Sequence, residues 1–399
     1  MVMLVAGLVA PAARAIEALR ADPDLTDYHK AGPVYWQPAL SLRDVGYDDN
    51  LFLTSDTSPA TTTFTWTVAP TARLFAPIGE RAAVRARGDL SYTSYARSGD
   101  QSFVGGGGAA RADYYLTRWN LYVDADYMTT RVRPTDEFHL RPRRVDQGIT
   151  FGARMVRSDR VSLHLYALQD DTTFRDVAQA GSTDFRARLD RNERAAGLGF
   201  AYRVGRMTDL TIESEARDYD FSEPDALTPL VRSRRMLAGL DWKPTSRVNA
   251  RLRAGRMTFD ADNLPGQSYD GATWSASLNV KLFSRLWAGL NGSRDVWLSA
   301  FENNLFAVST RGALNLTTSF TPKAGAELGG EYYLARYSDV GAVPERRLDH
   351  ASRVYVGGRY RFSDRLSASL RLTRFLRNSN IDGQDARENL VSASLDWLF

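Results

Sequence analysis

The sequence predicts an all-β protein: a transmembrane antiparallel up-and-down β-barrel of about 18 strands, with 16 as the nearest alternative and both termini in the periplasm. Three observations support this fold class. Short turn-like segments recur about every 40 residues, long runs of alternating apolar and polar residues lie between them, and the chain ends in an amphipathic run that finishes at Phe399. Together they predict a closed sheet with lipid on one face and water on the other.

The composition of the 399-residue chain excludes several other classes of protein. No stretch reaches the roughly 18 apolar residues that a transmembrane helix needs. The net charge is only +4 and the basic residues are spread along the chain, so we expect no nucleic-acid partner. Cysteine is absent, which is compatible with an exported protein and removes the usual thiolate ligands of zinc. We expect no cofactor and no metal site.

The start of the chain predicts a signal peptide over residues 1–15. The apolar run Val2–Ala10 precedes Ala-Arg-Ala at 13–15, which fits a cleavage site after its last alanine. A short apolar helix of the mature protein is the alternative. The basic residues that normally precede such a run are absent. This suggests that the true start codon lies further upstream or that residues are missing before Met1. We then expect a mature N-terminal periplasmic segment over 16–38 and the barrel over 39–399.

Eight tight turns are expected along the barrel. Several combine an aromatic or aliphatic residue, then Ser, Thr or Pro, then a basic residue, before alternation resumes. They lie at 76–79, 116–118, 157–159, 204–206, 243–246, 283–285, 320–323 and 362–365. Longer polar connections are expected at 131–144, 177–184, 222–228, 261–267, 337–346 and 378–385. Eight tight turns divide the chain into nine hairpins, which gives eighteen strands.

The segments between the turns alternate as membrane strands do. In Leu366–Thr373 the apolar residues take even positions and the polar residues odd ones. A β-propeller with a similar repeat length is the structural rival, but each of its blades would need four short strands in place of two long ones. Aromatic residues expected near the tight turns suggest an interfacial girdle: Trp66, Tyr114, Trp119, Tyr127, Phe200, Tyr202, Trp242, Phe283, Phe320, Tyr360, Phe362 and Trp397.

The last ten residues resemble the terminal strand by which the barrel assembly machinery recognises outer-membrane barrels. Val391, Leu395, Trp397 and Phe399 fall on one face of this strand, with the terminal phenylalanine in the expected place. This resemblance implies an outer-membrane location in a Gram-negative bacterium, with the assembly machinery and outer-membrane lipid as partners.

A segment after the first expected strand adds a family resemblance. Tyr-Asp-Asp-Asn-Leu-Phe at 47–52, together with turns of the Phe-Ser-Asp-Arg-Leu type, resembles the β-barrel porin-2 family over about residues 39–399. Members of that family are often associated with exopolysaccharide export. The resemblance therefore implies a periplasmic polysaccharide export protein and the polysaccharide itself as further partners.

Within this segment, Asp48, Asp49 and Asn50 are expected at the extracellular rim, where the first strand ends. Three readings are open for their oxygen atoms. They could coordinate calcium, which prefers carboxylate and amide ligands, but the glycine and closing glutamate of an EF-hand loop are missing. They could contact a sugar, or they could belong to a solvated loop that only ends the strand.

The expected lumen face carries many arginines. The predicted lumen-lining residues are Arg73, Arg85, Arg87, Arg111, Arg154, Arg203, Arg251, Arg253, Arg311, Arg353, Arg359, Arg361, Arg371 and Tyr355. Acidic residues on the same face should pair with some of them across the strands and hold the barrel open. The alternative is functional, because excess arginine near 353–361 would attract anionic solutes and bind carboxylates.

The sequence gives little support for an enzyme. The four histidines, His29, His139, His164 and His350, are scattered and show no zinc-binding spacing. The glycine run at 105–108 lacks the lysine and helix of a phosphate-binding loop and predicts a strand bend or bulge. We therefore expect no catalytic residues.

We expect a passive conduit for secreted exopolysaccharide through an arginine-rich, hydrated lumen. A general diffusion porin for small solutes is the first alternative, and a structural or adhesin barrel without transport is the second. In a diffusion porin a loop folds inward to narrow the pore, and the candidate loops, 131–144 and 337–346, look short for that role.

Overall fold

The computed structural model describes residues 22–133, 140–175, 179–180, 183–184, 189–222, 230–261, 268–299, 304–338 and 347–399. Almost all of the described chain is β-strand, with one short 3-10 helix at Gly99–Gln101. No helix in these ranges is long and apolar enough to cross a membrane. The predicted signal peptide over 1–15 lies outside the described residues.

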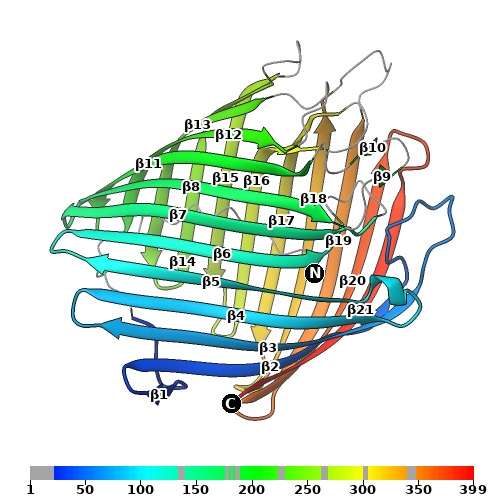
Figure 1. Cartoon of the computed structure of the whole chain (residues 1–399), viewed down its shortest axis with the longest axis horizontal. Helices are drawn as coiled ribbons and strands as arrows, with labels where there is room; N and C mark the ends of the chain where they lie inside the picture. The colour runs from blue at the N-terminus through cyan, green and yellow to red at the C-terminus, as the bar shows by residue number, and fades with distance from the viewer. Residues whose placement is uncertain are drawn as a thin grey trace.

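Eighteen long strands of the described chain form the barrel (Figure 1). They are β2 (Val34–Asp48), β3 (Thr63–Ile78), β4 (Ala82–Tyr95), β5 (Phe103–Tyr115), β6 (Trp119–Arg131), β7 (Arg143–Ser158), β8 (Val161–Arg175), β11 (Arg191–Gly205), β12 (Thr208–Phe221), β13 (Val231–Thr245), β14 (Val248–Ala261), β15 (Ser268–Lys281), β16 (Leu286–Leu298), β17 (Phe306–Ser319), β18 (Ala324–Tyr337), β19 (Leu348–Arg361), β20 (Leu366–Ser379) and β21 (Ala386–Leu398). Three short strands are β1 (His29–Ala31), which pairs with β2, and β9 (Gln179–Ala180) and β10 (Thr183–Asp184), which pair with each other.

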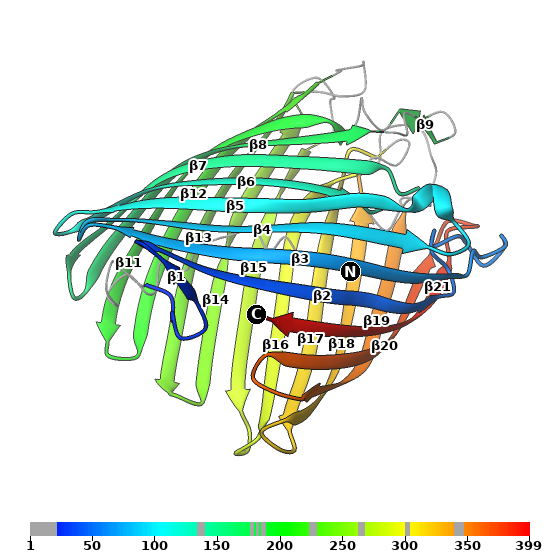
Figure 2. The same cartoon turned by 60° about the horizontal axis from the view of Figure 1, so that its bottom comes forward.

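Each long strand pairs antiparallel with its neighbours in the chain, and β2 closes the sheet against β21. The two strands lie side by side in Figure 2, although they come from opposite ends of the chain. At this seam a bulge separates Leu42 from Val45, and Asp44 adopts a positive φ of 56°. The predicted closed antiparallel barrel of 18 strands is confirmed.

The strands are long enough to cross a bilayer. They contain 13 to 16 residues, which at about 3.3 Å per residue and about 40° tilt span roughly 33 to 41 Å. The apolar band of an outer-membrane barrel is only about 25 Å tall. The strands therefore extend beyond the membrane core.

All eight predicted tight turns join neighbouring strands, and we call this end of the barrel the turn end. The opposite end, which carries the longer connections, is called the mouth. Of the six predicted long connections, only 378–385 lies wholly within the described residues, and it joins β20 to β21. Three further connections at the mouth, 49–62, 96–102 and 299–305, are absent from the predicted set.

The N-terminal boundary of the barrel differs from the prediction. The sequence predicts the barrel from residue 39, but β2 begins at Val34 because Tyr35 already pairs with Phe75 of β3. Leu25 and Tyr28, which precede β1, pack with Tyr35 against Phe75. The part of the predicted 16–38 segment that is described, from residue 22 onward, therefore contacts the barrel wall.

Candidate functional site

The inner wall of the barrel carries the arginines that the sequence predicts there. On β19, Arg353, Tyr355, Arg359 and Arg361 alternate with residues whose side chains are exposed on the outer wall, such as Val354. The other predicted members also lie on the face opposite the exposed apolar residues of their strands: Arg73, Arg85, Arg87, Arg111, Arg154, Arg203, Arg251, Arg253, Arg311 and Arg371. This face surrounds the lumen.

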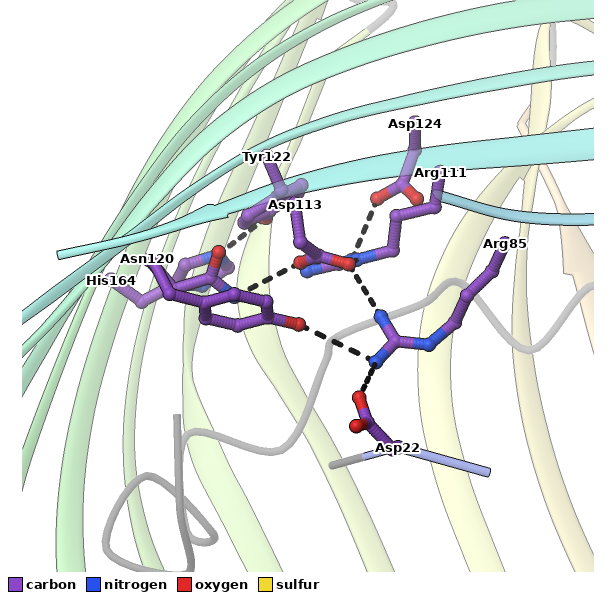
Figure 3. A network of polar contacts seen from close by, with 9 residues as sticks. Asp22, Arg85, Arg111, Asp113, Asn120, Tyr122, Asp124 and His164 are labelled. Carbon is purple, nitrogen blue, oxygen red and sulfur yellow. Dashed lines mark hydrogen bonds and ion pairs between the residues drawn. The ribbon is translucent and has the colours of Figure 1, made fainter. Parts of the chain in front are cut away.

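A first polar cluster covers the inner face of β4 to β6 (Figure 3). Asp113, whose side chain is almost fully buried, accepts from Arg85 at 2.5 Å and from Arg111 at 3.0 Å. Asn120 donates to the same carboxylate at 3.0 Å, and Arg111 also pairs with Asp124 at 2.9 Å. One buried carboxylate thus holds two predicted lumen arginines in fixed positions.

An aromatic stack extends this cluster along the wall. The guanidinium of Arg111 lies 3.9 Å from the ring centroid of Tyr122 on β6, and the Tyr122 hydroxyl is 2.6 Å from His164 Nε2 on β8. This contact crosses over β7, where Gly152 stands. A Cβ at position 152 would lie 2.1 Å from Tyr122 Cζ, so only glycine leaves room for the ring.

A second cluster of ion pairs joins β12 to β14. Arg253 of β14 is nearly buried and pairs with Glu213 at 2.8 Å and with Asp241 at 2.9 Å. Arg251 also pairs with Asp241, at 3.3 Å. These two predicted lumen arginines are neutralised by neighbouring carboxylates, so they hold the wall together rather than offer free positive charge.

On β17 to β20 the predicted arginines are only partly neutralised. Arg353 and Arg311 share Glu331, at 3.4 Å and 3.9 Å. Arg371 pairs with Glu327, and its guanidinium lies 4.8 Å from the ring centroid of Tyr355. On β19, Arg361 donates a hydrogen bond to the backbone carbonyl of Pro322 at 2.6 Å.

Five of the predicted lumen arginines form no ion pair with a carboxylate of the described chain: Arg73, Arg87, Arg154, Arg359 and Arg361. Arg73 and Arg87 are directly opposite each other on β3 and β4. Like charges at such positions repel each other, and water or an anion relieves the repulsion. Asp126 of β6 interacts electrostatically with Arg87 and offsets part of its charge, which leaves an excess of positive charge at this pair.

The mouth of the barrel is narrowed by the ends of β16 and β17, residues 295–299 and 304–308, which we call the β16–β17 tip. Asp295 of β16 lies 3.6 Å from Arg235 of β13, and the rings of Phe306 and Phe259 on β14 are 5.2 Å apart. Along the wall, three strand intervals would separate these residues by roughly 14 Å. The β16–β17 tip must therefore leave the wall and lean into the lumen.

Two apolar clusters hold the β16–β17 tip in this position. On one side Leu305, Phe306 and Val308 pack against buried residues of β12 to β14, among them Phe221 and Phe259. On the other side Trp297 and Ala307 join a cluster that the structure forms with Leu53, Tyr333, Tyr337, Ala335, Ala351, Phe375 and Ala386.

The wall opens at the base of the tip. Pairing between β15 and β16 ends at Trp274 and Arg294, although both strands continue toward the mouth. No pattern in the sequence predicts that this hairpin leans into the lumen. Its two candidate loops, 131–144 and 337–346, each include residues outside the described chain, and the described narrowing element is instead a strand hairpin. The contacts responsible are made between strands far apart in the sequence.

The segment at 48–50 does not form the solvated loop that was one of its expected readings. Asp48 and Asn50 are buried at the mouth. The Asn50 amide donates to the carbonyls of Thr54 and Arg387, while Asp49 accepts from the backbone and side-chain nitrogens of Asn389. These bonds tie the end of β2 to β21, so the segment fastens the closing seam.

Outward-facing aromatic residues form a belt at the turn end. Trp242, Phe283, Phe320 and Phe362 are all exposed there. Two predicted members, Trp66 and Tyr127, lie instead toward the mouth, because β3 begins and β6 ends there. The predicted C-terminal assembly residues Val391, Leu395, Trp397 and Phe399 are exposed on the outer wall of β21 or just beyond its end.

The comparisons with known proteins identify relatives in structure only. The sequence matches no protein-family model and no curated protein. Solved structures of porins do match. Pseudomonas aeruginosa OccK2 (OpdF) has a TM-score of 0.54 at 12% identity, covering 91% of this chain and 98% of that one.

Two further matches agree with this result. A structure of Pseudomonas aeruginosa OpdK with vanillate has a TM-score of 0.53 at 11% identity, with 91% and 99% coverage. Acinetobacter baumannii OccAB4 has a TM-score of 0.50 at 12% identity, with 93% and 99% coverage. The chain thus has the fold of outer-membrane porins of Gram-negative bacteria, in agreement with the predicted location. The exopolysaccharide-export subtype finds no support in these comparisons.

Proposed function

We propose that this protein is a passive outer-membrane channel for small anionic solutes, with carboxylates as the favoured class. The observation that carries the proposal is that Arg73, Arg87 and Arg359 of the inner wall form no ion pair with a carboxylate of the described chain. A guanidinium binds a carboxylate through two parallel hydrogen bonds. Such contacts are weak in a hydrated lumen, which lets the solute move on.

The width of the barrel and the narrowing of its mouth favour small solutes. Barrels of 16 to 18 strands leave an aqueous channel that side chains alone do not fill. Here the β16–β17 tip reaches across to Arg235 and Phe259, so the free opening is smaller than the barrel itself. A folded-in element of this kind suits a small-solute porin better than a wide polymer conduit.

The structural neighbours support the same choice. One of them, OpdK, has been solved with vanillate, which is a small aromatic carboxylate. At 11% identity the likeness concerns the fold, so the chemistry of the solute rests on the arginines of this chain. Transport through such a channel involves no chemical step, and we propose no enzymatic activity.

Planar-bilayer recordings test the proposal. We expect gluconate to reduce the chloride current by competing for the arginines, while neutral glucose of similar size leaves the current unchanged. The double variant R87Q/R359Q should lose the effect of gluconate. Arg234, an exposed arginine on the outer wall of β13, provides the matched control, and R234Q should behave as the wild type.

Three results would count against the proposal. A current that glucose and gluconate affect equally would show that the lumen does not select by charge. A large conductance that only an anionic polysaccharide blocks would favour the export conduit, which the family resemblance implied. If no conductance is found in a folded barrel, the structural or adhesin role becomes the better explanation.

A further inference from the structure

A groove of about 410 Å³ opens on the outer wall close to the mouth, where β5 and β6 separate. Pairing between these strands ends at Gly106 and Thr129, although β5 begins at Phe103 and β6 continues to Arg131. The groove is therefore a place where two neighbouring strands of a membrane barrel part, on the side that faces lipid.

The glycine run of β5 keeps the groove open. Gly106 has a φ of 145°, and a Cβ at this position would lie 2.3 Å from the carbonyl oxygen of Asp89. Any other residue would strain the backbone and push β4 away. Gly105 itself lines the groove, and a Cβ there would lie 2.6 Å from the ring of Phe103.

The two ends of the groove differ in chemistry. Leu90 and Val104 line one end and are more than half exposed on the outer wall. Arg131 and Arg143 line the other end and are directly opposite each other on β6 and β7. The groove is therefore apolar toward the middle of the barrel wall and strongly basic toward the mouth.

Hydrogen bonds fix both guanidinium groups at this basic end. Arg143 Nε donates to the Thr129 hydroxyl at 3.2 Å, and Arg131 donates to the backbone carbonyls of Asp100 and Arg141. Within the described part of the chain no carboxylate forms an ion pair with Arg143. In the described chain the two terminal nitrogens of Arg143 have no hydrogen-bond partner, so they can donate to the oxygens of a phosphate group.

Flanking aromatic residues indicate the depth of the groove in the membrane. Tyr92 and Tyr127 are exposed on the outer wall and pair with Val104 and Gly108 of β5. Tyrosine rings on a barrel's outer wall concentrate where the hydrocarbon core meets the lipid headgroups. Arg131 and Arg143 lie on the mouth side of these rings, at the level of the headgroups.

We propose that this groove binds an anionic phospholipid. Its phosphate lies between Arg131 and Arg143, and the upper part of an acyl chain lies on Leu90 and Val104. The site requires only that the barrel spans a membrane and does not depend on which solute passes through the lumen.

Native mass spectrometry of the full-length barrel in detergent tests this site. The barrel is titrated with phosphatidylglycerol and, separately, with phosphatidylcholine that carries the same acyl chains. We expect the wild type to retain one phosphatidylglycerol selectively. Since an arginine near an anionic lipid surface contributes about 1 kcal/mol, R131Q and R143Q should each weaken this binding about fivefold. Outer-wall R234Q, which removes the same charge away from the groove, should leave it unchanged.

A second variant separates the acyl end from the phosphate end. V104W fills the groove without changing its charge, and tryptophan is well tolerated at this depth of a membrane barrel. We expect it to weaken retention of phosphatidylglycerol as R143Q does. Inorganic phosphate in large excess should displace little lipid from the wild type.

Four outcomes would overturn the proposal. Equal retention of the two lipids would show that the headgroup is not recognised. A loss in R234Q as large as that in R143Q would indicate general surface electrostatics rather than a site. Ready displacement by inorganic phosphate, or no effect of V104W, would show that the apolar end contributes nothing to binding.

Discussion

Replacing Phe306 with alanine should release the β16–β17 tip from the inner wall and widen the mouth. Phe306 is buried in the apolar cluster that joins the tip to β12–β14, and its ring lies 5.2 Å from that of Phe259. No backbone hydrogen bond of the barrel wall depends on this ring. The substitution therefore acts on the position of the tip and leaves the closure of the barrel intact.

The size of the expected effect follows from the apolar and ionic contacts that hold the β16–β17 tip in the lumen. Leu305, Phe306 and Val308 are buried, and three such side chains contribute roughly 4.5 to 9 kcal/mol together. The ion pair of Asp295 and Arg235 adds about 0 to 1 kcal/mol, because the Asp295 side chain is half exposed. Loss of the Phe306 ring costs about 3 to 5 kcal/mol, which is about half of this total. This loss removes a large part of the attachment of the tip to β12–β14, so F306A should populate the released tip much more often than the wild type does.

Single-channel recordings in planar bilayers measure this effect. We expect F306A to show a larger conductance level that the wild type visits rarely. The matched control is F151A, which removes the same ring from the lipid-facing wall of β7, where Phe151 is exposed. An F306A channel with the same conductance as the wild type and F151A would refute the idea that the tip narrows the mouth.

Three further predictions concern stability and pH. Replacing Asp113 with alanine leaves two guanidiniums without their shared partner and should lower the unfolding free energy by roughly 2 to 4 kcal/mol in urea titrations. G152A forces a side chain into an occupied space and should cost about 1 to 3 kcal/mol, whereas G312A, with no atom within 4 Å of its new Cβ, should cost less than 1 kcal/mol in the same assay. Hydrogen bonds from Arg387 lower the pKa of Asp56 below its usual 3.8, so this tie is present above that pH and is lost as the pH falls through the lowered pKa. Hydrogen exchange of the backbone around Asp56 should accordingly quicken only in strong acid, and in D56N it should be fast at neutral pH as well.

Much of the architecture could be predicted because membrane strands obey local rules. The alternation in Leu366–Thr373 indicates which face of the strand contacts lipid, and the turn at 362–365 indicates where β19 ends. Both signals lie within a few consecutive residues. The count of eighteen strands followed from them without any knowledge of long-range contacts.

The features that the sequence did not reveal depend on contacts between distant strands. The approach of Phe306 to Phe259 and of Asp295 to Arg235 follows from the opening of the sheet between β15 and β16. The periodicity of apolar residues in the sequence does not predict such an opening of the sheet. The role of Asn50 was hidden for the same reason, because its carbonyl partner at Arg387 is 337 residues away.

Ion pairing in the lumen was predictable in kind but not in detail. Alternation places Arg87 and Arg253 on the same face, yet only the register of the strands shows that Arg253 is neutralised by two carboxylates. Arg87 instead faces Arg73. Register in a barrel of similar strands depends on bulges and turn geometry, which the pattern of apolar residues does not fix.

The reversal potential under a salt gradient tests the central claim most directly. With a tenfold gradient of potassium chloride across a planar bilayer, we expect the wild type to prefer chloride. An ion passing roughly 7 Å from a guanidinium gains or loses about 0.6 kcal/mol in water. Screening at 0.1 M salt reduces this to about half, so each arginine removed should lower the anion-to-cation ratio about threefold. The account predicts a clear shift toward zero in R87Q/R359Q and none in R234Q, whereas a cation-selective wild type, or a double variant with an unchanged potential, would contradict it.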